Sequence, residues 1–148
     1  MKIKSSSFKD GETIPTKYTC DGEDVNPLLE IRHIPEEAKS LALIVDDPDA
    51  SRGVPWDHWL VWNIPPRTQY IQESVVPSNA VQGVSSGGKV KYMGPCPMKG
   101  KDPHRYIFSL YALDKELELA EGAPKDELLR AMEGHILVKA ELVGMYGR

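Results

Sequence analysis

The sequence predicts a mainly β protein, an antiparallel β-sandwich with one short helix before its C-terminal strand. Short apolar segments recur along the chain and are bounded by Pro, Gly and Asp, a pattern typical of sandwich strands. Residues 104–113 alternate more regularly than any other stretch, and only the stretch after Pro124 has helical spacing. With 148 residues, the chain is expected to form a single domain over residues 1–148.

The first half of the chain contains three predicted extended segments and one predicted central strand. The extended segments are residues 3–8, 14–18 and 28–31. Residues 41–47 have two apolar faces, one carrying Leu43 and Val45, until the acidic end at Asp46 and Asp47. Two apolar faces are typical of a central strand in a layered structure. Asp47 falls on the face of Leu43 and Val45.

The middle of the chain is predicted to contain one long strand followed by a long loop. In residues 58–64, period two places His58 on one face with Leu60, Trp62 and Ile64. Residues 65–88 are rich in Pro, Ser, Asn and Gly and are predicted to form a loop with two short strands, around Tyr70 and Val81. A short strand at 89–92 then leads into a turn at 94–100.

The C-terminal part carries the clearest signals. In residues 104–113 the side chains of His104 and Tyr106 share one face of the predicted strand. A helix is predicted to begin at Pro124, where a first-turn proline is tolerated, and to end at Gly134. Residues 136–146 are predicted to be the last strand.

Composition excludes several classes of protein. The formal net charge of −4 argues against nucleic acid as a partner, because phosphate backbones need a basic face. No apolar run reaches the ~20 residues of a membrane span, and the N-terminus lacks an export signal, so a cytoplasmic location is expected. Cys20 and Cys96 lack metal-ligand spacing and are expected to be two buried thiols, with a disulfide left open.

A candidate site arises where acidic and aromatic polar residues border apolar strands. Asp47, Asp49, His58, His104 and Tyr106 would converge at the rim of the core if their strand faces met. Imidazole and phenol groups can donate hydrogen bonds to a small oxyanion, and Asp47 could orient a histidine. No HxH or HExxH spacing is present, so neither a metal nor another cofactor is predicted. Each residue alone also fits a purely structural role, as do the three tryptophans.

Several ordered motifs make a family resemblance visible. They are DDPDA at 46–50, HWLVWNIP at 58–65, and GPCP at 94–97 followed by HRY at 104–106. The chain resembles the phosphatidylethanolamine-binding protein (PEBP) family, and in particular its bacterial and archaeal Raf kinase inhibitor-like branch. Ser51, Met98 and the enlarged loop at 101–103 depart from the usual pattern.

The resemblance implies a PEBP-like sandwich with a small pocket for a phosphate or a phosphorylated head group. The residues it implies for ligand binding are Asp47, Asp49, His58, Gly94, Pro95, His104 and Tyr106. Relatives are described as binding phospholipid head groups, inhibiting kinases or inhibiting serine proteases, and prokaryotic members resemble homodimers. We therefore expect a non-enzymatic, kinase-inhibitor-like binding protein. Two alternatives remain: a serine protease inhibitor acting through an exposed loop (51–55 or 65–88), and a small hydrolase using Asp47 and His58.

Overall fold

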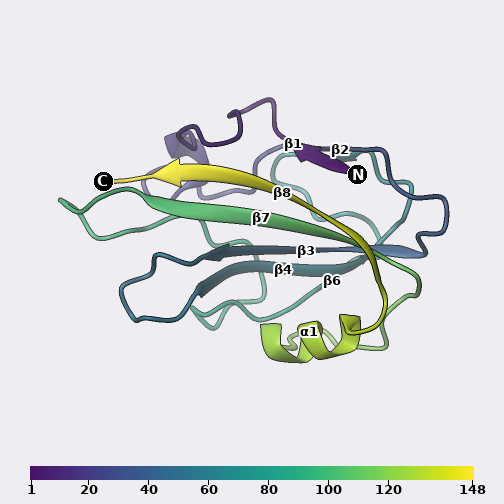
Figure 1. Ribbon diagram of the computed structural model, residues 1–148. Coiled ribbons are helices and arrows are strands. Elements are labelled where there is room, and N and C mark those ends of the chain that lie inside the picture. Colours follow the sequence, from purple (N-terminus) through teal and green to yellow (C-terminus); the bar gives the residue numbers. More distant parts are fainter.

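The computed structural model describes residues 1–148 and contains two antiparallel sheets and one α-helix (Figure 1). The larger sheet has the order β6-β4-β3-β7-β8 and the smaller one the order β1-β2-β5. Their bounds are β1 Lys2–Lys4, β2 Leu29–Arg32, β3 Ser40–Asp47, β4 Trp56–Ile64, β5 Tyr70–Ile71, β6 Val81–Gln82, β7 His104–Leu113 and β8 Ile136–Tyr146. The predicted mainly β fold with one helix before the last strand is confirmed.

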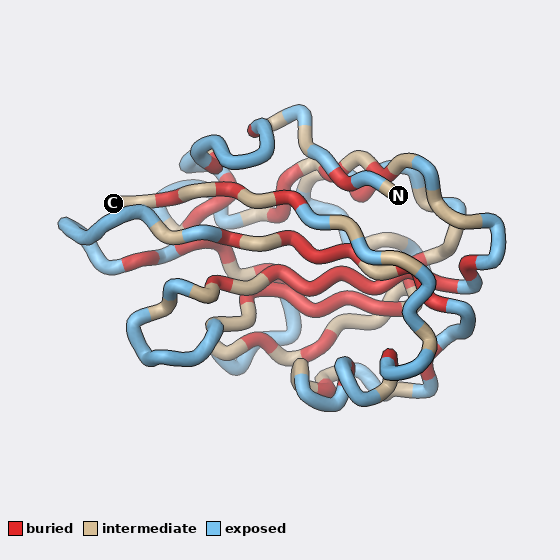
Figure 2. The backbone as a smooth tube through the Cα atoms, viewed as in Figure 1, coloured by how far each residue is buried: buried red, intermediate tan, exposed pale blue.

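Apolar residues cover both faces of the larger sheet at its centre. On one face, Leu43 and Val45 of β3 pack in a cluster that also contains Leu29 and Ile31 of the smaller sheet. On the other face, Ile44 packs in a second cluster beneath the helix. Figure 2 shows the resulting buried stripe along the central strands. The prediction of a central strand with two apolar faces is confirmed, and β3 is thereby fixed on both sides.

The helix α1 (Lys125–Met132) covers the second cluster. Pro124 precedes it in an extended conformation, and Gly134 follows with a φ of +79°, a left-handed value that glycine adopts without strain. Leu128 and Met132 are buried, whereas Leu129 is exposed. The predicted helix is therefore present, and Leu128 and Met132 form its buried side. None of the chain's helices has the length and apolarity to cross a bilayer.

Two β-bulges in β4 change which side chains share a face. Val45 pairs with Trp59 and Asp46 with Asp57, so His58 is an extra residue between them. The bulge turns His58 away from the face of Leu60. A second irregularity, where Asn63 has a φ of +53°, moves Ile64 into the cluster between the sheets. The prediction that His58, Leu60, Trp62 and Ile64 share one face is therefore wrong at both ends.

Three shorter predictions also change. The first strand covers only Lys2–Lys4, and the segment around Pro15 continues as the 3₁₀ turn Thr16–Tyr18. Residues 89–92 form no strand. Ser85 N donates to the Lys89 carbonyl and Lys89 N donates to Ser85 Oγ, so a turn ends at Lys89, and the Tyr92 side chain is buried. The Tyr92 hydroxyl donates to the Tyr18 carbonyl at 2.7 Å. The two short strands predicted near Tyr70 and Val81 are present.

The cysteines are not the two buried thiols that were expected. Cys20 and Cys96 form a disulfide, with their Cα atoms 5.4 Å apart, and Cys96 is exposed. The fold brings the 94–97 turn onto the loop that follows the 3₁₀ turn, where Cys20 N donates to Pro95 O at 3.1 Å. A sequence separation of 76 residues gives no sign of this proximity.

Candidate functional site

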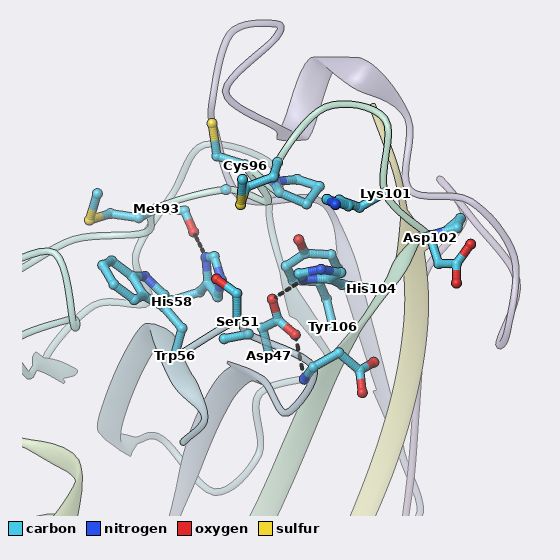
Figure 3. Close-up of a pocket in the computed structure, with 16 residues that line it drawn as sticks. Asp47, Ser51, Trp56, His58, Met93, Cys96, Lys101, Asp102, His104 and Tyr106 are labelled. Carbon is cyan, nitrogen blue, oxygen red and sulfur yellow. Dashed lines mark hydrogen bonds and ion pairs between the residues drawn. The ribbon is translucent and has the colours of Figure 1, made fainter. Parts of the chain in front are cut away.

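One end of the larger sheet carries a cavity of about 770 Å³ (Figure 3). In antiparallel strands the end of one meets the start of its neighbours, so the end of β3 lies beside the starts of β4 and β7. Asp47, Trp56, His58, His104 and Tyr106 therefore meet at this edge. The loops at 49–51 and 93–103 complete the wall.

All but one of the residues predicted for the site line this cavity. The lining includes Asp47, Asp49, His58, Gly94, His104 and Tyr106. Pro95 does not line it; its carbonyl instead accepts the hydrogen bond from Cys20 N. The β4 bulge is what brings His58 to the side of Asp47, since strict alternation would have placed it on the opposite face.

Asp47 orients His104. The Asp47 side chain is nearly completely buried, and its Oδ2 lies 2.7 Å from His104 Nδ1, while its Oδ1 accepts from Asp49 N at 2.8 Å. An ionised carboxylate can only accept, so His104 Nδ1 carries the hydrogen. The other ring nitrogen, Nε2, is then the one left for a ligand. The histidine that Asp47 contacts is His104, and not His58 as the hydrolase alternative required.

His58 is oriented by the backbone. Its Nδ1 lies 2.6 Å from the carbonyl oxygen of Met93, which can only accept, so Nδ1 again carries the hydrogen. Burial lowers the pKa of the His58 imidazole below its ordinary value. Tyr106 packs edge-on against this ring at 5.2 Å and stacks on His104 at 6.4 Å. The Tyr106 ring thus lies between two imidazoles, and the tautomer of each is determined by the hydrogen bond at its Nδ1.

The tautomers determine what the pocket offers a ligand. A neutral imidazole that donates through Nδ1 presents a lone pair at Nε2, and it becomes a donor there only after taking up a proton. The expectation that both rings would simply donate to an oxyanion therefore needs correction. Donation at Nε2 of His58 requires proton uptake on binding.

Asp49 lines the cavity, but its carboxylate is hydrogen-bonded to Arg105. Its carboxylate accepts from Arg105 Nε at 3.0 Å, from Nη2 at 2.9 Å and from the backbone N at 2.9 Å. These bonds, the side-chain ones foremost, lower the pKa of Asp49 to about 2. Asp49 therefore ties the acidic turn to β7, and its charge is offset by the guanidinium.

Comparison with known proteins shows what the chain is related to. A family model described as phosphatidylethanolamine-binding protein matches residues 4–147. A UPF0098 protein of Methanothermobacter thermautotrophicus is 49% identical over 153 residues, which span 100% of this chain and 99% of that protein. The chain belongs to the PEBP family.

Two solved structures of PEBP proteins resemble this one closely. A PEBP homologue from Chlamydia trachomatis superposes with a TM-score of 0.94 at 42% identity, covering 99% of this chain and 97% of that one. Escherichia coli YbcL, described as a new member of the mammalian PEBP family, gives a TM-score of 0.93 at 30% identity, covering 99% and 98%.

Several cavity residues of this PEBP protein were not singled out from the sequence. Trp56 lines the cavity beneath the Arg52 guanidinium, which lies 4.8 Å from its ring centroid, whereas Trp59 and Trp62 are core residues. Lys101 also lines the cavity and forms no ion pair. Apolar contacts come from Ala50, Met93, Pro97, Met98 and Pro103. Trp56 could have been found only from the strand pairing, because it lies directly opposite Asp47 on the neighbouring strand.

Gly94 allows the 93–98 segment to pack tightly against the neighbouring loop. A Cβ at position 94 would lie 2.4 Å from Tyr18 O and 2.8 Å from Thr19 Cα, both backbone atoms. We expect Gly94→Ala to lower the free energy of unfolding by about 2–3 kcal/mol, because the backbone must shift. Urea denaturation would measure this. Gly53→Ala is the control: it meets nothing within 4 Å and should cost only its left-handed backbone, about 1 kcal/mol. Equal losses would contradict the close-packing argument.

Proposed function

We propose that this protein is a non-enzymatic binding protein whose pocket takes a small anion of the phosphate or phosphorylated head-group type. The observation that carries the proposal is the paired orientation of two imidazoles. Asp47 holds Nδ1 of His104 and the Met93 carbonyl holds Nδ1 of His58, so both Nε2 atoms remain for a ligand in one cavity.

The charges of the cavity make protonation of the imidazoles decisive for an anionic ligand. Lys101 is the one lysine or arginine of the lining and has no ion-pair partner, whereas Asp47, Asp49 and Asp102 are lining carboxylates, of which Asp49 is offset by Arg105. Once protonated, each imidazole can give a charge-assisted hydrogen bond to an anion, worth about 1.5–3 kcal/mol. Asp47 accepts the hydrogen of His104 Nδ1 and so leaves Nε2 of that ring for the ligand.

The size and lining of the cavity support a ligand larger than a bare phosphate. A volume of about 770 Å³ falls in the range of small-molecule sites, and Trp56 and Met98 provide apolar surface on its wall. Met98 is 61% exposed, so its part of this apolar surface is open to solvent. A phosphate attached to a larger organic group would use both the imidazole pair and this surface.

The direct test is removal of one imidazole. We expect His104→Ala to weaken phosphate and phosphoethanolamine binding about tenfold or more, from the loss of one charge-assisted bond. His104→Asn, which can still donate to Asp47 but has no Nε2, should lose a similar factor. Isothermal titration calorimetry measures both. His135→Ala is the matched control, because His135 forms the same kind of pair with Asp114, at 2.8 Å, away from the cavity. Unchanged affinity in both His104 variants would remove the proposal.

The hydrolase alternative has less support from the geometry. The predicted pair of Asp47 with His58 is replaced by Asp47 with His104, and no hydroxyl group is hydrogen-bonded to either imidazole. An activated nucleophile normally has such a bond to its base. Turnover of a phosphoester or ester that is abolished by His58→Ala would overturn the non-enzymatic assignment.

The protease-inhibitor alternative is favoured by one specific observation. Val54 is 54% exposed at the tip of the 51–55 loop, and Arg52 braces this loop by donating to Ser86 Oγ at 3.0 Å and to the Pro55 carbonyl. An exposed, braced loop suits insertion into a protease cleft. Inhibition of a chymotrypsin-like protease that survives His104→Ala and is lost in Val54→Asp would support it. Three further expectations stay predictions: that the protein inhibits a kinase, that it forms a homodimer, and that it is located in the cytoplasm.

A further inference from the structure

The Cys20–Cys96 disulfide is part of the wall of the cavity. Cys96 lines the cavity together with Gly94, Pro97, Met98, Lys101 and Asp102. This wall belongs to a single segment, residues 94–103, that pairs with no strand of either sheet. Figure 3 shows Cys96 and Lys101 along one side of the cavity and Asp47 along the other. The position of this segment therefore sets the width of the pocket.

The start of the segment is anchored without the disulfide, since Gly94 N donates to Asp24 Oδ1 at 2.7 Å and Cys20 N donates to Pro95 O at 3.1 Å. Fewer polar contacts hold the part from Cys96 to Pro103. Arg148 Nη1 donates to the Pro97 carbonyl at 3.3 Å, and Gly100 N donates to the Arg148 carbonyl at 2.9 Å. Arg148 is held in turn by an ion pair with Asp21 at 2.9 Å, in which both side chains are partly exposed. Such surface contacts contribute little individually. Apart from the backbone at its two ends, the disulfide is the one covalent link between the segment and the rest of the fold.

We propose that the Cys20–Cys96 disulfide is a thiol-exchange site whose reduction frees residues 96–103 and weakens anion binding in the cavity. The inference rests on the proposed anion-binding function, and it names a means of regulating that site. Cys96 is exposed and Cys20 is half-buried, so a small thiol such as glutathione or a dithiol can reach the bond. An imidazole pair binds an anion tightly only while the opposite wall stays in place, since pre-organisation lowers the ordering cost.

The surroundings favour a particular order of steps. An external thiolate attacks Cys20 Sγ, a mixed disulfide forms there, and Cys96 Sγ leaves with the electron pair as a thiolate. The Arg148 guanidinium, whose Nη1 lies 3.6 Å from Cys96 Sγ, stabilises that departing thiolate. A second thiolate then attacks the mixed disulfide and releases Cys20. One disulfide of the reductant forms, the protein disulfide is reduced, and the two protons of the reductant thiols go to the two protein sulfurs.

The binding test compares two redox states of the whole protein. We expect phosphate affinity, measured by calorimetry, to fall about tenfold after anaerobic reduction with dithiothreitol. The Cys20→Ser/Cys96→Ser variant should show the reduced affinity whether or not dithiothreitol is present. Equal phosphate affinity in oxidised and reduced wild-type protein would overturn the proposal.

A second readout does not depend on a ligand. The freed segment contains the exposed trypsin sites Lys99 and Lys101, and reduction should speed cleavage there several-fold. Arg52, on the 51–55 loop, provides an internal control, because its cleavage rate should change only if the whole protein unfolds. Faster cleavage at Lys99 and Lys101 without phosphate binding in either state would reject the proposed function and leave the released segment established. Equal cleavage in both redox states would reject the released segment.

Discussion

Replacing both Cys20 and Cys96 by serine is expected to lower the free energy of unfolding by about 4 kcal/mol. The disulfide joins residues 76 positions apart, so it removes many conformations from the unfolded chain. Urea denaturation followed by tryptophan fluorescence measures the loss. The three tryptophans are suitable probes because Trp59 and Trp62 are completely buried in the native state.

The redox state of the wild-type protein provides the control for this variant. Reduced wild-type protein should unfold at the same urea concentration as the double-serine variant, and oxidised protein at a distinctly higher one. Dithiothreitol should leave the variant unchanged. A difference below about 1 kcal/mol between oxidised and reduced wild-type protein would contradict the chain-entropy argument, because it would mean that the disulfide removes little conformational freedom from the unfolded chain.

Sulfate affinity is expected to rise as the solution is acidified from about pH 8. If one imidazole takes up a proton on binding, the rise is about tenfold per pH unit. Burial lowers the pKa of His58 in the unliganded protein, so its ring is neutral at neutral pH. An anion at Nε2 needs the protonated ring and therefore draws in a proton. Sulfate is chosen because its charge does not change over this range, whereas phosphate itself titrates.

Calorimetry in buffers of different ionisation enthalpy would count the protons directly. The expected result is net proton uptake on sulfate binding, reduced in a His58→Asn variant and unchanged in His135→Ala. Binding without proton uptake would show that the anion is held by donors other than His58. It would also show that the neutral tautomer persists in the complex.

The lowered pKa of His58 also determines how the stability of the folded protein changes with pH. Because the folded pKa of His58 lies below its ordinary value of 6.5, the unfolded chain binds this proton more readily than the folded protein. The stability associated with the neutral ring is complete above about pH 6.5 and is lost as the pH falls toward the lowered value.

Local sequence patterns were sufficient for much of the fold. Two apolar faces identified β3 as a central strand, strict alternation identified β7, and Pro124 with Gly134 marked the ends of the helix. These features depend on contacts between neighbours in the chain, whose propensities act locally. The strand faces indicated a site formed by Asp47, Asp49, His58, His104 and Tyr106. The family resemblance added Gly94 and Pro95, and all of these residues but Pro95 line the pocket.

Features that depend on pairing between distant segments could not be predicted. No local pattern reveals that β4 carries an extra residue at His58, yet this bulge brings the imidazole to the side of Asp47. Nor does sequence show that Asp47 contacts His104 and leaves His58 to the Met93 carbonyl.

By itself, the sequence determined which residues have chemistry to offer and which strands carry them, because side-chain type and period two are local properties. The tertiary structure alone decided strand register, the Cys20–Cys96 bond and the partner of each imidazole nitrogen. Those outcomes depend on how separate segments of the chain pack together, and the ligand that the pocket accepts depends on them.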